Sequence, residues 1–230
     1  MNFLSHFYFE RQANNAEQTL GSILPDLLRN MDRDIHIFPE KEAWKYKYDE
    51  KVNSIYYGWC RHLEADRLFH NAIFFIEKTQ QIKAYIIPVT LNTPIRPSFL
   101  SHITLELLLD RLLLKDSWLH ENDFYNQLAR VDQDSLVNFL SLSGVQDYAA
   151  FLVYFNGFIT DRYLGSYRNM EQIAYALDQI CKKFWPDGLG HKKKDQLVTA
   201  LNEYERELAY NYKAIFNEIA LHLELHTKTC

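Results

Sequence analysis

Apolar residues recur at helical spacing along almost the whole chain of 230 residues. The clearest run lies between residues 194 and 226, where one stripe is formed by Leu197, Leu201, Tyr204, Leu208, Ile215, Ile219 and Leu223. Seven glycines and six prolines are too few for a loop-rich or all-β fold, and no strand–helix alternation is visible. The sequence therefore predicts an all-α fold, with a single helical domain over residues 1–230.

The same spacing predicts the positions of the individual helices. They are expected over residues 14–30, 49–79, 98–115, 121–142, 145–160, 169–184 and 194–226. Pro25 interrupts the first of these, while Asp49 and Asn169 are suitable N-caps. Residues 31–48 have no clean period and are predicted to form a loop. Three prolines predict an irregular connector over residues 84–97.

Composition restricts the classes of partner. A net charge of −5 argues against nucleic acid, because phosphate binding needs a concentrated basic face. No run approaches about 18 uninterrupted apolar residues, so no membrane span is expected. The start lacks a basic segment and soon meets Glu10 and Arg11, unlike a signal peptide. Cys60, Cys181 and Cys230 are too widely spaced for a disulfide framework or a zinc motif. Free thiols and a cytoplasmic location are expected.

Two predicted helices carry histidine and carboxylate side chains four residues apart. His62 and Asp66 project from one helical face and can hold one metal ion, and His70 continues the series. Such a pair is common by chance on surface helices. A second helix repeats the spacing with His102 and Glu106, which makes coincidence a weaker explanation.

The second of these helices is apolar almost all round, so it is predicted to be buried. It also carries Asp110, one further step of four residues along. Buried carboxylates need partners, because an isolated one costs several kcal/mol. A metal ion is one solution. An ion pair with Arg61 or Arg67, or a position at the open rim of the bundle, is the other.

Five short motifs occur in order along the chain. They are Asn2-Phe3-Leu4-x-His6, Gly21-x-x-x-x-Asp26, Gly58-x-x-x-His62-x-x-x-Asp66, Ile103-Thr104-Leu105-x-x-x-x-Asp110 and Tyr167-Arg168-x-Met170. Each is nonspecific, and His6 alone would be a hydrogen-bonded core histidine. In this order and spacing, however, the motifs resemble those of the acyl carrier protein phosphodiesterase family. The likeness runs from residue 2 to about residue 185 and is sparse between motifs.

The resemblance implies an HD-domain-like helix bundle that hydrolyses the phosphodiester between 4′-phosphopantetheine and a serine of acyl carrier protein. It also implies a divalent cation, typically manganese, with iron, magnesium or zinc as alternatives. The metal set carried over comprises His6, Asp26, His62, Asp66 and Asp110. Glu106 or His102 is then available as acid, base or orienting group, and Arg168 could clamp a phosphate oxygen or form a surface ion pair.

Three features depart from the family pattern. His70 stands where an aspartate is common, His102 stands where no histidine is expected, and residues 31–57 match poorly, which predicts a different substrate-facing loop. Acyl carrier protein is acidic, so a basic docking surface is expected. The run from His191 to Lys194 is the candidate, with a solvated loop as the alternative. Two other functions stay open, a metallohydrolase of another phosphate ester and a non-catalytic helical binding protein.

Overall fold

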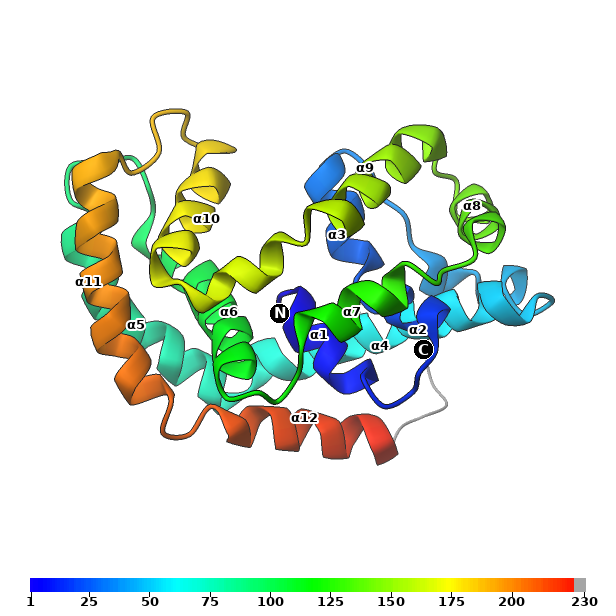
Figure 1. Ribbon diagram of the computed structural model, residues 1–230, viewed down its shortest axis with the longest axis horizontal. Helices are drawn as coiled ribbons and strands as arrows, with labels where there is room; N and C mark the ends of the chain where they lie inside the picture. The colour runs from blue at the N-terminus through cyan, green and yellow to red at the C-terminus, as the bar shows by residue number, and fades with distance from the viewer. Residues whose placement is uncertain (226–230) are drawn as a thin grey trace. The chain divides into compact units, whose positions relative to one another are not determined.

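Residues 1–225, which the computed structural model describes, form helices joined by loops and contain no strand (Figure 1). The predicted all-α fold is confirmed. The chain divides into two units, each assembled from separate stretches of sequence. Among the described residues, unit 1 holds 1–67, 119–163 and 220–225. Unit 2 holds residues 68–118 and 164–219.

Unit 1 is built from short helices around the longer α4. Its elements are α1 (Phe3–Glu10), α2 (Ala16–Gly21), α3 (Leu24–Met31), η1 (Pro39–Lys41), η2 (Ala43–Lys45), most of α4 (Glu50–Asn71), α7 (Glu121–Leu128), α8 (Gln133–Leu142) and α9 (Tyr148–Asp161). Helix α2 packs on α7, and α3 packs on α9. Aromatic rings fill the space between helices, as where Phe7 meets Phe124 with ring centroids 5.2 Å apart. This packing holds α1, α2 and α3 in place.

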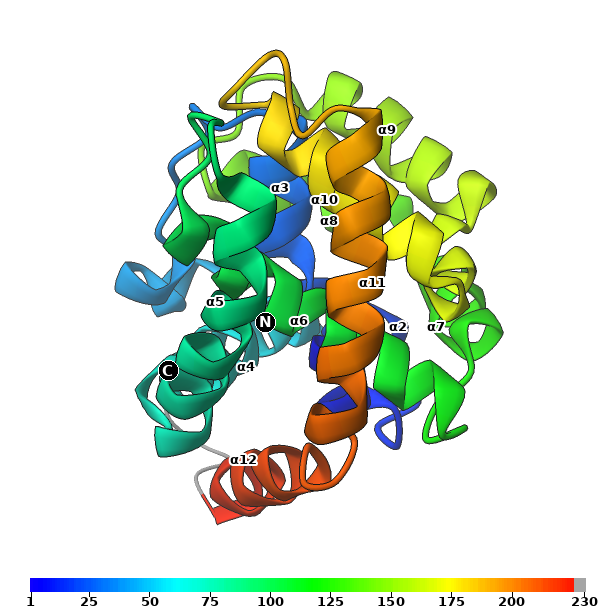
Figure 2. The same cartoon turned by 90° about the vertical axis from the view of Figure 1, so that its left-hand side faces the viewer.

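Unit 2 is built from longer helices. They are α5 (Ile73–Thr90), α6 (Pro97–Lys115), α10 (Met170–Lys182) and α11 (His191–Leu208). The 3-10 helix η3 (Tyr163–Arg168) has its first residue in unit 1, and α12 (Lys213–Leu225) begins in unit 2 and ends in unit 1. Helices α5 and α10 each pack on both α6 and α11 (Figure 2). Arg111 on α6 donates to Glu205 on α11 at 3.0 Å within this core.

Several predicted helices are divided in the structure. The first becomes α2 and α3, because Pro25 lies in the first turn of α3 and cannot donate to the preceding turn. The second breaks at Ala72, whose backbone is extended. Helix α5 continues through Pro88 and ends at Thr90. The irregular connector predicted over residues 84–97 is therefore wrong for residues 84–90. The helices predicted over 121–142 and 194–226 each divide into two, and His226 lies outside the described residues. Helix α1 was not predicted.

The predicted N-caps are confirmed. Asp49 Oδ1 accepts hydrogen bonds from the backbone amides of Lys51 and Val52, both at 2.9 Å. The side chain of Asn169 accepts one from the amide of Glu171 at 2.8 Å. Each cap satisfies backbone donors that have no partner inside the helix, so these two helix starts could be read from sequence.

The described helices include none with the length and apolar character needed to cross a membrane. Cys181 is a free, buried thiol, and burial raises its pKa to about 12. Cys60 is disulfide-bonded, so the prediction of free thiols is wrong at that position. Cys230 lies outside the described residues.

Candidate metal centre

Two glycines let the backbones of α2 and α4 touch in unit 1. A Cβ added to Gly58 would lie 2.1 Å from Gln18 O and 2.9 Å from Gly21 Cα. A Cβ on Gly21 would lie 2.0 Å from Ile55 O. Only glycine fits at such a crossing. The contact brings the end of α2 against the face of α4 that carries His62, one turn beyond Gly58.

The buried ring of His62 is oriented by this crossing. Its Nδ1 lies 2.8 Å from the carbonyl oxygen of Ser22, the C-cap residue of α2. A carbonyl can only accept, so in the neutral ring Nδ1 carries the hydrogen and Nε2 keeps its lone pair. This is the arrangement typical of metal-binding histidines. Nε2 lies 3.8 Å from Asp66 Oδ2, one turn further along α4.

His6, on α1, stacks against His62 with ring centroids 4.0 Å apart and an angle of 19° between planes. Its Nε2 is buried and has no hydrogen-bond partner; the closest approach of a carboxylate, Asp66 Oδ1, is 3.4 Å. Burial and the neighbouring His62 lower the pKa of His6 to about 3. The ring is therefore neutral at physiological pH, and its lone pair is available to a cation.

Asp66 completes the group, and its side chain is 31% exposed. Burial favours the neutral acid, but His6, His62 and the amino group of Met1, at 2.6 Å from Oδ1, hold the pKa of Asp66 well below its usual range. Ligand atoms of His6, His62 and Asp66 all lie within 4.8 Å of one another. Two imidazole nitrogens and one carboxylate oxygen suit Mn²⁺, Fe²⁺ or Zn²⁺. The residues present therefore fit the divalent cation that the sequence predicts.

A cavity of about 280 Å³ opens beside this group. It is lined by Pro25, Asp26, Leu28, Arg29, Ile35, His36, Ile37, Phe38, Glu40, Trp59, His62, Leu63 and Asp66. Asp26 thus shares a cavity with two of the three ligand residues, but it is not one of the three. Residues 35–40 come from the segment that matches the family pattern poorly, and they form one wall. Arg29 and His36 bring nitrogen donors that the sequence analysis did not select.

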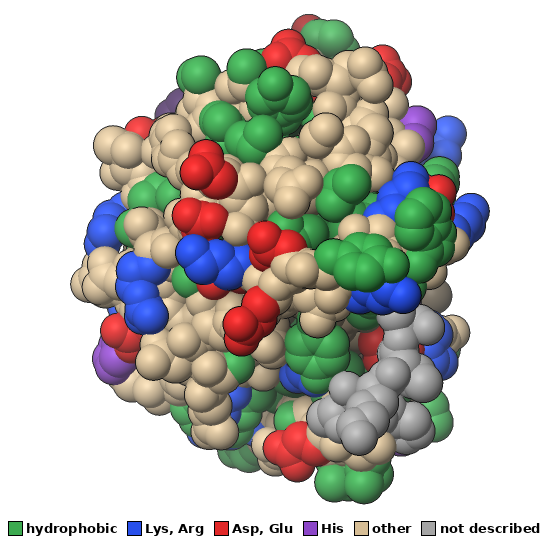
Figure 3. Space-filling model, turned by 90° about the vertical axis from the view of Figure 1, so that its right-hand side faces the viewer, with side chains coloured by type: hydrophobic (Ala, Val, Ile, Leu, Met, Phe, Trp, Pro, Cys, Tyr) green, Lys and Arg blue, Asp and Glu red, His purple; other side chains and the backbone are tan. Residues whose placement is uncertain are grey.

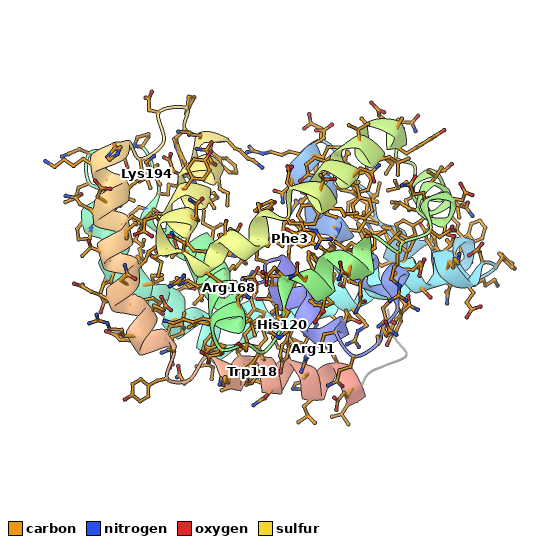
Figure 4. All side chains as sticks on the ribbon, in the orientation of Figure 1. Phe3, Arg11, Trp118, His120, Arg168 and Lys194 are labelled. Carbon is orange, nitrogen blue, oxygen red and sulfur yellow. The ribbon has the colours of Figure 1, made fainter. Side chains whose placement is uncertain are left out.

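The remaining predicted site residues lie in unit 2. Asp110 is fully buried on α6 and belongs to neither ligand group found among the described residues. His102 and Glu106 form the second such group with His70. Arg168 is exposed at the end of η3 (Figure 4), and its carbonyl oxygen accepts a hydrogen bond from Arg111. The roles predicted for Asp110 and Arg168 stay predictions.

The lysine run proposed for docking forms the first turn of α11. Lys193 Nζ donates to Val89 O at 2.9 Å, near the end of α5. Lys194 Nζ lies 3.7 Å from Asp178 Oδ2 on α10. Figure 4 shows Lys194 beside this helix. Both side chains are half-buried. Two of the three lysines therefore join helices within unit 2, and Lys192 and His191 remain as exposed groups.

Comparison of the chain with models of known families, with curated proteins and with solved structures finds no match. The fold and the site define an all-α protein with a candidate metal centre of two histidines and an aspartate. The functional conclusion therefore rests on this geometry and on the resemblance of the ordered motifs.

Proposed function

We propose that the chain is a metal-dependent phosphodiesterase acting at His6, His62 and Asp66, with holo-acyl carrier protein as substrate. One observation carries the metal centre: His6 Nε2 is buried and neutral, and it has no hydrogen-bond partner. A buried polar atom without a hydrogen-bond partner costs about 1–3 kcal/mol of folding free energy. In a helical binding protein whose histidines only pair internally, nothing would explain why His6 Nε2 is left without a partner. A cation held with Asp66 and His62 offsets that cost.

The chemistry divides between the cation and the side chains. When bound, a divalent cation lowers the pKa of water from about 15.7 toward about 7 and neutralises a phosphoryl oxygen. His6, His62 and Asp66 would hold it, and the Ser22 carbonyl keeps His62 in the required tautomer. Arg29, on the cavity wall, is placed to bind an anionic phosphate oxygen. Asp26, on the same wall, can accept a hydrogen bond from a water molecule.

The loop beside the cavity supports a protein substrate. It exposes Phe38, Trp44 and Tyr48, whose exposed fractions are 54%, 61% and 81%. Lys41 Nζ lies 4.1 Å from the centroid of the Phe38 ring, and Lys47 Nζ lies 5.0 Å from that of Tyr48. Figure 3 shows basic side chains next to hydrophobic ones on one face of the molecule. Exposed aromatic rings next to lysines suit an acidic protein that also makes apolar contacts. These rings and lysines lie closer in sequence to the cavity wall than Lys192 does.

The substrate is tested by release of phosphopantetheine. We expect the protein with Mn²⁺ to release 4′-phosphopantetheine from holo-acyl carrier protein, measured by mass spectrometry of the carrier. Nucleotide diesters serve as control substrates and should be hydrolysed far more slowly. Turnover of the nucleotide diesters alone would instead favour a metallohydrolase of another phosphate ester, and turnover of neither substrate would contradict the proposal.

Charge reversal locates the docking surface in the same assay. The double variant Lys41→Glu and Lys47→Glu should raise KM for holo-acyl carrier protein by about tenfold, because it repels an acidic partner. Its rate on a small diester should not change. Lys192→Glu is the matched control, since it reverses one exposed lysine of the alternative surface. If only Lys192→Glu raises KM, docking occurs through α11.

A further inference from the structure

We propose that His70, His102 and Glu106 form a second divalent-metal site, contained in unit 2 and independent of the proposed function. His102 and Glu106 lie one turn apart on α6, and His70 lies near the end of α4. His102 Nε2 is 3.1 Å from His70 Nε2 and 3.0 Å from Glu106 Oε1. His70 Nε2 is 3.4 Å from the same carboxylate oxygen. Three potential ligand atoms therefore surround one point.

One hydrogen on each ring nitrogen cannot give a direct hydrogen bond to each of the three contacts in this group. Each Nε2 carries at most one hydrogen, and an ionised carboxylate carries none. If both nitrogens donate to Glu106 Oε1, two donors face each other at 3.1 Å. If one nitrogen donates to the other, the carboxylate oxygen faces a lone pair. A cation at the centre satisfies the three atoms together.

The spacing matches that of zinc ligands. Nitrogen and oxygen ligands lie about 2.0–2.2 Å from zinc, so at tetrahedral angles they lie about 3.3 Å from one another. The three distances here, 3.0, 3.1 and 3.4 Å, are close to that value. Two imidazoles favour Zn²⁺ and related transition metals over Ca²⁺ or Mg²⁺, which prefer all-oxygen sites. Three protein ligands leave a fourth position for water or another ligand.

The surroundings hold the rings and keep the site accessible. The ring of Phe75 lies edge-on to both imidazoles, at 4.9 Å from His70 and 5.0 Å from His102. The side chains of His70 and His102 are 32% and 41% exposed, so an ion can enter from solvent. His102 also lines a cleft of about 590 Å³ with Arg96, Phe99 and Trp185. The cleft therefore adjoins one of the three ligand residues.

Cobalt titration tests this site separately from the first. Co²⁺ in a tetrahedral site gives strong visible absorption, and equilibrium dialysis gives the number bound per chain. In the Asp66→Asn variant, where the first group is disabled, we expect one Co²⁺ with that absorption. Adding His102→Ala should weaken this binding by at least about 100-fold, because it removes a direct ligand. His191→Ala, which removes an exposed histidine of the same unit, is the control and should change nothing.

The side chains replaced in Asp66→Asn and His102→Ala are both partly exposed. Circular dichroism checks that the helices persist in these variants. His70→Gln provides a second variant with the same expected loss. If the Asp66→Asn protein binds no Co²⁺, or if both His102→Ala and His70→Gln leave its Co²⁺ affinity unchanged, the second site does not exist. If the parent protein binds Co²⁺ through His102 but releases no phosphopantetheine from holo-acyl carrier protein, only the proposed function is overturned.

Discussion

Replacement of Asp66 by Asn is expected to reduce kcat/KM on holo-acyl carrier protein by about 10³-fold or more, equivalent to about 4 kcal/mol of transition-state stabilisation. The amide keeps the size of the side chain but removes the only negative charge among His6, His62 and Asp66. Two imidazoles without a carboxylate hold a divalent cation weakly, so metal content should fall with activity. Steady-state kinetics and metal analysis on the same sample measure both.

Glu64→Gln is the matched control for this variant. Glu64 lies on the same helix but pairs with Arg67 at the surface, with Oε1 2.6 Å from Nη2. Its replacement should leave turnover and metal content unchanged, since surface pairs contribute little. If Asp66→Asn kept the metal content and turnover of the parent protein, Asp66 would not be a ligand.

Gly58→Ala should destabilise the protein and weaken metal binding together. The added Cβ would lie 2.1 Å from Gln18 O, so α2 and α4 must separate. Overpacking of this kind costs about 3 kcal/mol, which lowers Tm by about 6–12 °C in a chain of this size. Separation also moves the Ser22 carbonyl away from His62 Nδ1. Loss of such an orienting contact costs about 10- to 100-fold in metal affinity.

Gly157→Ala provides the control, measured by thermal unfolding and by metal titration. Gly157 lies within α9, and an added Cβ there meets nothing within 4 Å. Alanine should therefore stabilise the helix by about 0.5–1 kcal/mol and leave metal affinity unchanged. A Gly58→Ala protein with the Tm and metal affinity of the parent would show that the close crossing does not set the position of His62.

Local patterns in the sequence predicted the all-α fold and much of the ligand chemistry. The pairs His62–Asp66 and His102–Glu106 are each one turn apart, and each pair enters a ligand group. Asp110 does not join its pair. Successive steps of four residues drift by about 40° each around a helix, so the third member of such a series faces a different direction.

Features that depend on tertiary packing could not be predicted from periodicity. His6 comes from a different helix, and only the ordered motifs connected it with His62. Gly21 and Gly58 were visible in those motifs, but their role depends on two helices crossing within backbone contact. Arg29 and His36 lie at the end of a helix and in a loop, where no period marks a functional side chain. The third ligand of the second group, His70, needed the packing of α4 against Phe75 and His102 to be located.

Metal removal and return tests the central claim most directly. The protein is treated with a chelator, dialysed, and assayed for phosphopantetheine release from holo-acyl carrier protein before and after Mn²⁺ is added. We predict that activity falls to background after chelation and returns with Mn²⁺, and that no return occurs in Asp66→Asn. Full turnover by the metal-free protein would contradict the account.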